Sequence, residues 1–450
     1  MKTIIMAGGK GTRISSIISD IPKPMIKICG KPVLEHEIEC LKDQGFTQII
    51  MTVSHLSSVI MDYFGDGGGV SPATGHPFGV TIEYFVEEKP LGNAGALFKL
   101  RDKLDDDFLL LNADSLFDVD FQKFVTFHRM HGGLATLFTH PNNHPYDSGV
   151  IIADEMHVVQ QWLTKEDRRP KYYKNRINAG LHVLNPEIFN TLEMDIDEIG
   201  DVDVTGKTVK VDLDRQILKP LADTGKMFCY DSPEYVKDMG TPERYESVCH
   251  DFESGKVHSK NLRNKQKAVF IDRDGTINKY VGFLRDIDSF ELLPEVAEAI
   301  KIINNSEYLT IVVTNQPVIA RGELTVEELR EIHNKMETLL GNKGAYIDAI
   351  YYCPHHPDKG FKGEIKELKV ECDCRKPKPG MLLKAAQDFN IDLMSSWMIG
   401  DSERDIKAGK AAGCRTVLLG ASDFGQDETM NRLLEAVTFI IERGNIEIIR

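Results

Sequence analysis

Two aspartates, Asp272 and Asp274, end an apolar stretch that reads "AVFIDRDGT". Residues two apart on a strand point to the same face, so both carboxylates would lie on one side. Because ligands of open α/β sheets bind at the carboxyl ends of strands, we expect a reactive site there. The two carboxylates could bind Mg²⁺, or one could act as a nucleophile while the other moves protons. For such a motif taken alone, a pair that caps a turn is the alternative.

Three further segments of the same half carry groups that suit phosphate chemistry. "IVVTNQ" ends an apolar run with Thr314 and Asn315, and "CRKPKPG" supplies Lys376. "SWMIGDSERD" ends another run with Asp401, and Asp405 follows one helical turn later. In this order the four segments resemble the haloacid dehalogenase superfamily of phosphotransferases, over the whole second half of the chain.

The resemblance implies a mechanism through an aspartyl-phosphate. Asp272 would attack phosphorus, and Asp274 would protonate the leaving oxygen and later activate water. Cations must screen the repulsion between a carboxylate and a phosphate dianion, which is the implied role of Lys376 and Mg²⁺. The implied phosphate ligands are Thr314 and Asn315, and the implied Mg²⁺ ligands are Asp272, Asp274 through its backbone, and Asp401.

Four soft or borderline metal ligands lie close together in "YCPHHP" and "ECDCRKP". The pattern C-x-H, a loop and C-x-C suits a closed tetrahedral Zn²⁺ site with a structural role. Such a site would hold the loop directly ahead of Arg375 and Lys376, and reduced cysteines in an ordinary loop are the alternative. We expect the neighbouring His356 to be a bystander. The predicted ligands are Cys353, His355, Cys372 and Cys374.

The segments "YYCPHHP" and "CDCRKPKPGM" look like those of the heptose 1,7-bisphosphate 7-phosphatases, with the histidinol-phosphate phosphatases as close relatives. That family usually shows Ser-Gly after "TNQ", whereas this chain has Pro317 and Val318. Arg321 is in place for the distal phosphate or sugar, and Arg375 is a further candidate for substrate binding. The departure leaves the preferred anomer and substrate open.

The first half begins with a strand-like run that breaks into the glycine turn "MAGGKGTR". Glycines let backbone N–H groups approach a phosphate, and Lys10 and Arg13 add positive charge. The turn lacks the Gly-Lys-Ser/Thr end of a P-loop and is not the dinucleotide fingerprint. A tight connection without a ligand is the alternative.

Five further segments, in order, make the chain up to about residue 250 resemble the sugar-1-phosphate nucleotidyltransferases: "IPKPM", "PLGNAGAL", "LLLNADSLF", "INAGLHVL" and "YVKDMGTPERY". The implied reaction is attack of a sugar 1-phosphate oxygen on the α-phosphorus of a nucleoside triphosphate, which expels pyrophosphate. Such a reaction needs positioning and charge neutralisation.

The resemblance assigns cations and metal ligands to this reaction. Lys10 and Arg13 would contact the triphosphate, and Lys23 would reach the α-phosphate region. Asp114 and Asp238 would hold Mg²⁺, although Asp238 could equally be a turn residue. The other implied substrate-binding residues are Gly8, Gly9, Gly11, Gly92, Asn178 and Gly180.

One side chain bears on the nucleotide base. In "FVEEKPLGNAGAL", Glu87 stands where thymidylyl and uridylyl relatives usually carry Gln, with Glu88 as the other candidate. A carboxylate accepts hydrogen bonds from the N1–H and N2–H₂ edge of guanine and would leave O4 of uracil or thymine without a donor. Glu87 therefore favours GTP, and a solvated glutamate pair is the alternative.

Relatives grip the sugar phosphate with Glu-Lys, but this chain reads "WLTKEDRRPKYYKNRINAG" at that point. Lys165, Glu166 or Lys171 could take the role. The alternative is a solvated basic loop near the sugar phosphate, formed by Arg168, Arg169, Lys171, Lys174 and Arg176.

These residues need elements that present them at the edges of sheets. Apolar runs at residues 2–9, 48–54, 108–114 and 134–140 alternate with helix-like segments, which predicts a mostly parallel sheet. The alternation starts over at residue 267. The predicted fold is therefore α/β with two domains, of which residues 1–251 form a Rossmann-like, glycosyltransferase-A-like mixed sheet. Residues 252–265 are the predicted linker, and residues 266–450 form a haloacid dehalogenase-like Rossmannoid domain with a zinc-pinned loop.

The composition limits the partners and the compartment. A net charge of −15 without a basic run argues against nucleic acid and anionic membranes. The start does not read as a signal peptide, and no apolar stretch reaches membrane-spanning length, so we expect a cytoplasmic protein. Eight cysteines in a reducing compartment favour free thiols or metal ligands. The expected partners are small molecules, namely sugar phosphates and a nucleoside triphosphate, and the oligomeric state is open.

The two implied reactions fit together if the first product is the second substrate. Removing the 7-phosphate of D-glycero-D-manno-heptose 1,7-bisphosphate leaves the 1-phosphate ready for activation. The sequence therefore predicts a bifunctional enzyme, a phosphatase and nucleotidyltransferase of nucleotide-activated heptose biosynthesis for surface glycan or lipopolysaccharide. Mg²⁺ is expected in both domains and structural Zn²⁺ in the phosphatase. The alternatives are a mannose-type guanylyltransferase fused to a phosphatase for another sugar phosphate or histidinol phosphate, and a chain with one non-catalytic binding or regulatory domain.

Overall fold

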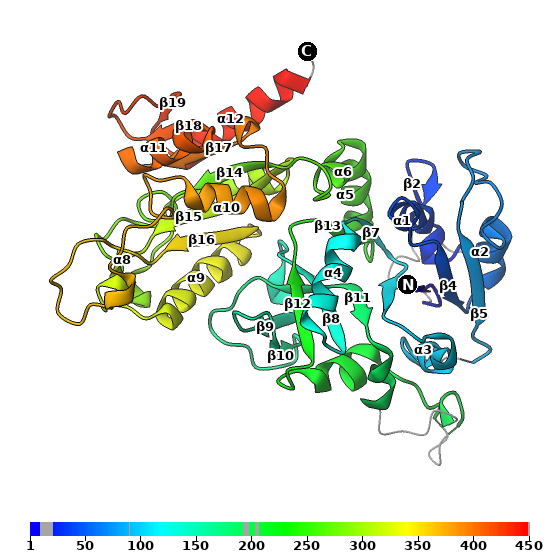
Figure 1. The fold of residues 1–450 in the computed structure, drawn as a ribbon. Coiled ribbons are helices and arrows are strands. Elements are labelled where there is room, and N and C mark those ends of the chain that lie inside the picture. Colours follow the sequence, from blue (N-terminus) through cyan, green and yellow to red (C-terminus); the bar gives the residue numbers. More distant parts are fainter. Residues whose placement is uncertain (10–20, 90, 192–197, 203–206, 449–450) are drawn as a thin grey trace. The chain divides into compact units, whose positions relative to one another are not determined.

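The computed structural model describes residues 1–9, 21–89, 91–191, 198–202 and 207–448. The chain forms two compact units (Figure 1). Unit 1 comprises Met1–His140, Ile151–Leu163 and Asn178–Asn261. Unit 2 comprises Pro141–Val150, Thr164–Ile177 and Leu262–Arg450. The two α/β sheets that the sequence predicts are confirmed, and the domain bounds that it predicts stay a prediction.

Unit 1 is built on a mixed nine-stranded sheet with the order β10-β9-β11-β6-β1-β4-β5, in which β8 pairs with β11 and β12 with β8. Strands β4, β1 and β6 run parallel, and β11 runs antiparallel to β6. The strands are β1 Thr3–Met6, β4 Gln48–Val53, β5 Thr81–Val86, β6 Phe108–Asn112, β8 Ala135–His140, β9 Val150–Ala153, β10 Val159–Leu163, β11 Ile177–Leu184 and β12 Met227–Asp231. Two short pairs stand apart: β2 Lys27–Ile28 with β3 Lys31–Pro32, and β7 Ser115–Asp118 with β13 Tyr235–Asp238.

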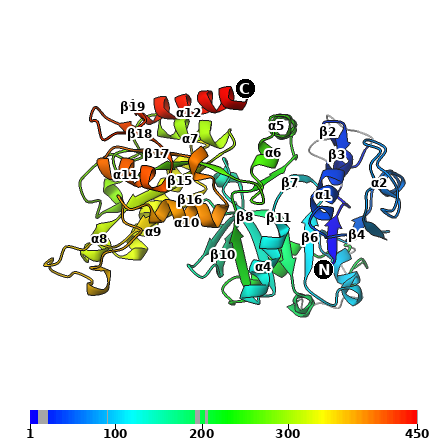
Figure 2. The same ribbon diagram turned by 45° about the horizontal axis from the view of Figure 1, so that its top comes forward.

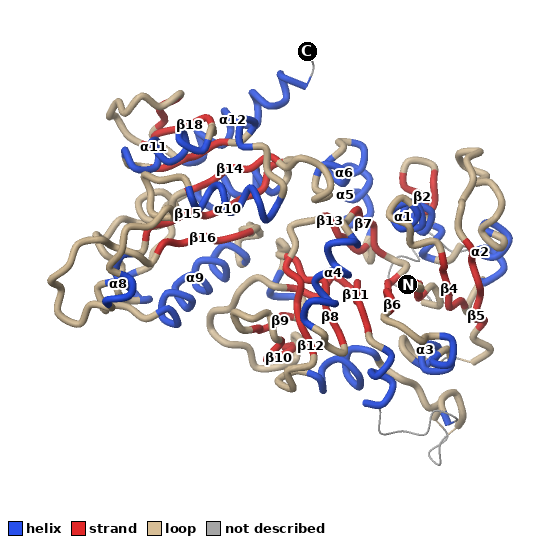
Figure 3. Tube along the Cα trace, viewed as in Figure 1, coloured by secondary structure: helices blue, strands red, loops and turns tan. Residues whose placement is uncertain are grey.

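The central strands of unit 1 are apolar on both faces because helices and loops cover both. Ile4 and Leu110 pack into one core, whereas their chain neighbours Ile5, Leu109 and Leu111 pack into another. The helices of this unit are α1 Val33–Lys42, α2 Ser57–Phe64, α3 Gly95–Lys99, α4 Phe121–His131, α5 Pro242–Glu253 and α6 Lys256–Ser259 (Figure 3). The continuous apolar runs of the sequence therefore correspond to buried parallel strands.

Unit 2 contains a six-stranded sheet, all parallel, with the order β16-β15-β14-β17-β18-β19. Its strands are β14 Lys267–Ile271, β15 Tyr308–Asn315, β16 Ala349–Cys353, β17 Trp397–Gly400, β18 Arg415–Leu419 and β19 Glu428–Met430. Its helices are α7 Val296–Asn304, α8 Pro317–Ala320, α9 Val326–Gly341, α10 Gly380–Phe389, α11 Glu403–Ala412 and α12 Leu433–Ile448. Helices α7, α9 and α12 share one core with the sheet and α10 shares the other, and Figure 2 shows α12 and α10 on opposite sides of the strands.

Two segments from the first half of the sequence belong to unit 2, and one of them packs on α9. The backbone N–H of Tyr173 donates to Thr338 Oγ1 at 2.9 Å, and that hydroxyl donates back to Tyr173 O at 3.1 Å. The backbone N–H of Asn175 donates to Glu337 Oε2 at 2.8 Å. Because these groups are buried, the bonds hold the segment Thr164–Ile177 firmly to the helix.

Over the part of the chain that the structure describes, every helix is too short or too polar to cross a bilayer.

Candidate active sites

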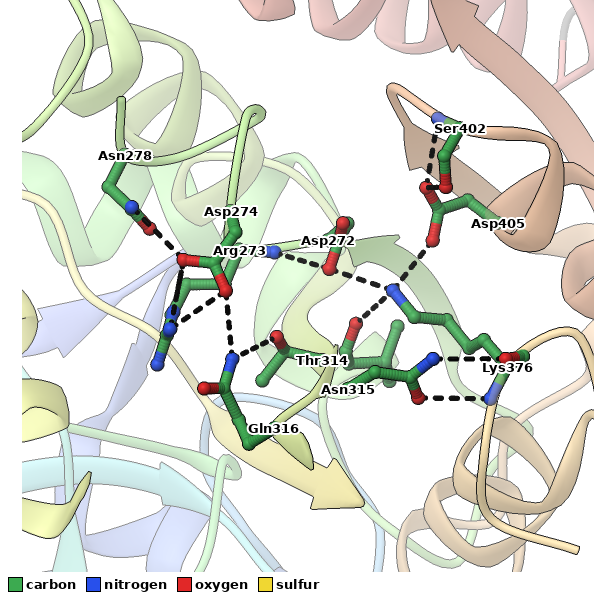
Figure 4. A network of polar contacts seen from close by, with 11 residues as sticks. Asp272, Arg273, Asp274, Asn278, Thr314, Asn315, Gln316, Lys376, Ser402 and Asp405 are labelled. Atoms are coloured by element: carbon green, nitrogen blue, oxygen red, sulfur yellow. Dashed lines mark hydrogen bonds and ion pairs between the residues drawn. The ribbon is translucent and has the colours of Figure 1, made fainter. Parts of the chain in front are cut away.

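The sheet of unit 2 presents a buried ion pair at the carboxyl end of β14. Asp272 follows this strand directly, and Lys376 Nζ donates to Asp272 Oδ1 at 2.7 Å and to Val313 O at 2.8 Å (Figure 4). The same ammonium lies 2.6 Å from Asp405 Oδ1. Lys376 is 3% exposed, so its charge is little screened by water.

Burial and the neighbouring charges shift the pKa of both partners. Burial, reinforced by the Asp405 carboxylate and opposed by Lys376, raises the pKa of Asp272 to about 7. Burial alone would lower the pKa of Lys376, but the Asp272 and Asp405 carboxylates raise it above its ordinary value. Lys376 therefore stays charged beside the carboxylate that the sequence predicts to be the nucleophile.

Three carboxylates of this site could hold a divalent cation. Asp272, Asp401 and Asp405 each offer an oxygen, and these oxygens lie within 4.8 Å of one another. Oxygen ligands of this kind suit Mg²⁺. Gly275 has φ +91°, and a Cβ there would lie 2.0 Å from Asp401 Oδ2, so the turn must be a glycine for this carboxylate to approach. The donor set fits the predicted metal.

The donor set differs in one member from the predicted set. Asp405 is the third residue of α11 and forms a capping box with Ser402, whose hydroxyl donates to Asp405 Oδ2 at 2.6 Å. In the sequence, the position of Asp405 one helical turn after Asp401 was the available signal for this role, which the prediction did not include. The side chain of Asp274 is turned to other partners, so only its backbone remains a predicted Mg²⁺ ligand.

The Asp274 carboxylate receives hydrogen bonds from three residues (Figure 4). Arg273 donates to both oxygens, at 2.8 to 3.1 Å. Gln316 Nε2 donates to Oδ2 at 2.8 Å, and Asn278 Nδ2 donates to Oδ1 at 3.1 Å. This carboxylate is therefore held in one place without using Lys376.

Thr314 and Asn315, the predicted phosphate ligands, both lie at the end of β15. Gln316 Nε2 donates to Thr314 Oγ1 at 2.9 Å. Asn315 accepts from the backbone N–H of Lys376 at 3.0 Å and donates to its carbonyl at 2.9 Å. The Asn315 amide therefore fixes the peptide that carries Lys376, which the sequence did not indicate.

A cavity opens over these groups. Asp272, Asp274, Thr314, Asn315 and Lys376 line it together, so the structure brings these predicted residues to one place. The cavity wall also includes Tyr280, Phe283, Pro317, Val318 and Arg404. Pro317 and Val318 stand where the resembling family usually shows Ser-Gly. Arg404 was not among the predicted site residues.

The two predicted substrate-binding arginines lie beside this wall. The guanidinium of Arg321 lies 4.0 Å from the ring centroid of Phe283 and 4.4 Å from that of Phe361. Such stacking on two rings fixes its position. Arg375 Nη1 donates to the carbonyl of His355 at 3.2 Å, which ties it to the predicted zinc loop.

The four predicted zinc ligands converge. The sulfur atoms of Cys353, Cys372 and Cys374 lie 3.2 to 3.5 Å from one another, and His355 Nδ1 lies 3.3 Å from Cys374 Sγ. Zn–S bonds of about 2.3 Å in a tetrahedron place sulfur atoms about 3.8 Å apart, so the donor set fits Zn²⁺. His356 instead accepts from the backbone N–H of Asp358 at 3.2 Å and stays outside the cluster.

In unit 1, Lys23 and Asp114 form an ion pair with 2.6 Å between Nζ and Oδ2. Asp114 follows β6, and the next residue, Ser115, pairs with Asp238 in the β7–β13 ladder. The structure thus brings Asp238 opposite the residue that follows Asp114 in the chain. Arg244 Nη1 contacts both carboxylate oxygens of Asp238, at 2.9 and 2.8 Å. Burial alone would raise the pKa of Asp238, but Arg244, with smaller contributions from Gly240 and Lys23, holds it below its ordinary value.

Glu37 of α1 is a further carboxyl group near this pair that the sequence analysis missed. It is fully buried. Burial, reinforced by the Asp114 carboxylate, raises its pKa well above the ordinary value. The raised pKa favours the neutral form of this carboxyl group beside Asp114. Its place in an amphipathic helix gave no signal of this.

Glu87 lies against the glycine turn of unit 1. A Cβ added to Gly8 would lie 3.1 Å from Glu87 Oε1, and Glu87 Oε2 accepts from the backbone N–H of Leu91 at 3.4 Å. Burial raises the pKa of Glu87, and the Leu91 amide partly offsets this. Glu88 is exposed, so the structure favours Glu87 over Glu88 as the residue near the turn.

The remaining predicted residues of unit 1 have separate surroundings. Among the described residues, no atom lies within 4 Å of a Cβ added to Gly9, its chain neighbours aside. Gly92 (φ +86°) approaches Val211 so closely that a Cβ would lie 2.3 Å from its carbonyl oxygen. Asn178 Oδ1 accepts from Gly180 N at 3.3 Å and lies 3.2 Å from His182 Nε2. The predicted residues Lys10, Gly11 and Arg13 lie outside the described residues.

The basic segment that the sequence left open lies within unit 2. Arg169 donates to the carbonyls of Pro145, Ser148 and Thr164, so its guanidinium is used in binding the two segments of unit 2 together. Lys165 lies 3.2 Å from Asp147.

Comparisons with known proteins match both halves of the chain. A family model described as nucleotidyl transferase matches residues 2–254, and one described as HAD-hydrolase-like matches residues 373–442. The D-glycero-beta-D-manno-heptose-1,7-bisphosphate 7-phosphatase of Salmonella typhi is 42% identical to the chain over 152 residues, which are 34% of this chain and 79% of that protein. The protein of the same name from Escherichia coli (strain K12) is 41% identical over 152 residues, 34% of this chain and 78% of its own length. The solved structure of HddC from Yersinia pseudotuberculosis covers 56% of this chain and 99% of its own, with 26% identity and a TM-score of 0.45.

Proposed function

From the premise that the chain belongs both to the nucleotidyl transferase family and to the family of the heptose 1,7-bisphosphate 7-phosphatases, we propose a bifunctional enzyme that makes a nucleotide-activated heptose. Its phosphatase half would remove the 7-phosphate of D-glycero-D-manno-heptose 1,7-bisphosphate. Its transferase half would then join GMP to the heptose 1-phosphate. The observation that carries the proposal is the buried pair of Lys376 and Asp272 at the end of β14.

In the phosphatase half, Asp272 would attack the phosphorus of the 7-phosphate while the bond from phosphorus to O7 breaks. Asp274 would give a proton to O7, and the heptose 1-phosphate would leave. Asp274 would then take a proton from water, whose oxygen attacks the aspartyl-phosphate and frees Asp272 and inorganic phosphate. Lys376 and the end of β15 would hold the phosphoryl oxygens.

Asp272, Asp401 and Asp405, with the backbone of Asp274, would hold Mg²⁺. When bound, this cation would offset the negative charge that keeps a carboxylate and a phosphate apart.

The distal end of the substrate, away from the 7-phosphate, would lie near two arginines. Arg321, stacked on Phe283 of the cavity wall, and Arg375 would bind the 1-phosphate or the sugar. Pro317 and Val318 are apolar and buried, so they offer the substrate no polar side chain at that wall. This feature supports a second candidate, a phosphatase for another sugar phosphate joined to a mannose-type guanylyltransferase.

The zinc ligands would hold the loop that precedes Lys376. Cys353, His355, Cys372 and Cys374 use all four tetrahedral positions, so no position is left for substrate, and the role would be structural. The hydrogen bond from Arg375 to the His355 carbonyl supports this coupling between loop and cations.

In the transferase half, an oxygen of heptose 1-phosphate would attack the α-phosphorus of a nucleoside triphosphate, and pyrophosphate would leave. Lys23 would neutralise charge at the α-phosphate, Asp114 and Asp238 would hold Mg²⁺, and Asn178 and Gly180 would face the sugar. The loop residues Gly8, Gly9, Lys10, Gly11 and Arg13 would cradle the triphosphate.

GTP is the proposed nucleotide because Glu87 can only accept hydrogen bonds when ionised, and guanine offers N–H donors. The place of Glu87 against Gly8 supports this. Since both reactions use small phosphorylated metabolites, and since the free cysteines suit a reducing compartment, we place the enzyme in the cytoplasm, where it would supply surface glycan or lipopolysaccharide assembly.

The test is a one-pot assay with each anomer of heptose 1,7-bisphosphate, Mg²⁺ and each nucleoside triphosphate in turn. Phosphate and pyrophosphate are followed separately, and Asp272→Asn is the control. Phosphate release, followed by pyrophosphate release with GTP only, would support the whole proposal. Phosphate release that persists unchanged in Asp272→Asn would contradict the assignment of Asp272 as the nucleophile. Pyrophosphate release with another nucleoside triphosphate but not with GTP would contradict the assignment of guanine as the base.

A further inference from the structure

Arg273, between the two aspartates of the phosphatase site, is a fully buried arginine with partners on two sides. Its Nε and Nη2 donate to the Asp274 carboxylate, and the shortest of these contacts is 2.8 Å (Figure 4). Its Nη1 lies 3.2 Å from Nε2 of His333. Arg273 is 0% exposed, so no water replaces either partner.

The contact with His333 fixes the state of the imidazole. A guanidinium has only donors, so His333 Nε2 must accept and must carry no proton. His333 lies on α9 and is 8% exposed. Its burial, and next to it the charge of Arg273, lower the pKa of His333 well below the ordinary value. The contact with the guanidinium and the lowered pKa both favour a neutral ring that accepts through Nε2.

Asp274 depends on Arg273 more than on its other partners. Of the five donor contacts to its carboxylate, Arg273 makes three, Gln316 makes one and Asn278 makes one. At Nη1, on the side away from Asp274, Arg273 has one side-chain acceptor among the described residues, which is His333. Removing that acceptor would leave a buried N–H without this partner, and the free-energy cost would favour a shift of the guanidinium.

We propose that His333 is a positioning residue of the phosphatase reaction, which sets the place of Asp274 through Arg273. The inference rests on the proposed function, in which Asp274 transfers the proton to the leaving oxygen. None of the sequence motifs includes His333, which lies 60 residues from Arg273 along the chain. General acid catalysis contributes about 10²–10⁴-fold to such reactions, and a displaced acid loses part of that.

The experiment compares His333→Leu with His333→Gln in the full-length protein. Glutamine keeps an acceptor near the position of Nε2, and leucine does not. The first-turnover rate is measured with heptose 1,7-bisphosphate, whose alkoxide leaving group needs a proton, and with p-nitrophenyl phosphate, whose leaving group does not. We expect His333→Leu to lose about 10-fold or more with the sugar substrate and less than about 3-fold with p-nitrophenyl phosphate. His333→Gln should restore most of the loss.

Equal losses with both substrates in His333→Leu, or equal losses in the leucine and glutamine variants, would overturn the inference, because a general packing defect acts in this way. The midpoint of thermal unfolding of each variant identifies one that has failed to fold. If the wild-type protein releases phosphate from neither substrate, the proposed function fails.

A second readout, independent of activity, tests the contact between Arg273 and His333 on which the inference depends. The imidazole ¹⁵N shifts of His333 must report an unprotonated Nε2 at neutral pH in the wild type, and they must change in Arg273→Met. A protonated Nε2, or shifts that are the same in both proteins, would overturn it.

Discussion

The ammonium of Lys376 lies 2.7 Å from Asp272 Oδ1, inside a site where only 3% of the lysine is exposed. The pair joins β14 to a loop more than a hundred residues later in the chain. Its position fits a cation that offsets charge on a phosphoryl group as it is transferred. The geometry of this pair also supplies the most direct test of the phosphatase half.

Lys376→Met should reduce the rate of phosphate release by about 10²–10³-fold, because charge stabilisation of this kind contributes that much. Lys378→Met is the matched control, since this lysine is two residues away and its side chain is 46% exposed. The measurement is kcat for phosphate release in each variant. Loss of activity in both variants to the same degree would argue against a specific role for Lys376.

Asp114→Ala should abolish pyrophosphate formation and leave phosphate release unchanged. Asp114 lies 2.6 Å from Lys23, so the variant removes both a proposed metal ligand and the partner of a proposed catalytic cation. Asp106→Ala, at an exposed position, is the control. Loss of both reactions in Asp114→Ala would contradict independent active sites.

Glu87→Gln should move the preference of the transferase away from GTP and towards UTP or dTTP, by roughly 10-fold or more in the ratio of kcat/KM values. Glutamine offers the donor that O4 of uracil or thymine needs. Glu88→Gln is the matched control because Glu88 is exposed. An unchanged base preference in Glu87→Gln would place base recognition elsewhere.

The Cys/His cluster should bind one zinc ion per chain, measured by elemental analysis of the purified protein. Cys374→Ser should lower the zinc content and the thermal unfolding midpoint of unit 2, because binding of a structural metal stabilises the folded state. Cys249→Ser, at a free cysteine outside the cluster, should change neither. Full zinc content in Cys374→Ser would rule out this ligand.

His36 should make unit 1 sensitive to acid. Its Nε2 lies 3.1 Å from Ile28 O, and burial, reinforced by the charge of Lys31, lowers its pKa to about 4. An unfolded histidine takes up a proton near pH 6.5, so between about pH 6.5 and 4 the unfolded state binds more protons and stability falls as the pH falls.

Between about pH 7 and pH 5, the wild type should lose about 2 kcal/mol more stability than His36→Gln. The chain has two tryptophans, and Trp162 belongs to unit 1. Urea unfolding followed by its fluorescence, with Trp397→Phe in both proteins, reports on that unit. Equal losses in the two proteins would show that His36 is not the group responsible.

The sheets of both units could be predicted from the sequence because their strands are buried on both faces. Residues such as Ile4 and Ile5 pack into different cores, so the chain needs an unbroken apolar run at that point. Residues at the ends of such runs, Asp272 and Asp114 among them, could be placed for the same reason. The cluster of cysteines was predictable because its ligands are close in the sequence.

Other parts of the site depend on packing between distant segments, which local patterns do not record. Arg273 reads as an ordinary charged residue in a turn, and only the packing of α9 brings His333 to it. Arg404 reads as a solvated helix residue, yet it lines the cavity. The docking of Tyr173 on Thr338 likewise depends on the folded chain, because the two residues are 165 positions apart.

The hydrogen bonds from Tyr173 and Asn175 to α9 bear on which residues a separately expressed phosphatase half would contain. A fragment that begins at Leu262 would keep the whole six-stranded sheet but would lack Tyr173 and Asn175, which occupy the Thr338 hydroxyl and the Glu337 carboxylate. Both groups of α9 would then lose their hydrogen bonds to the backbone of the segment Thr164–Ile177. A phosphatase half expressed from Leu262 onwards would therefore lack part of the packing that α9 has in the full chain.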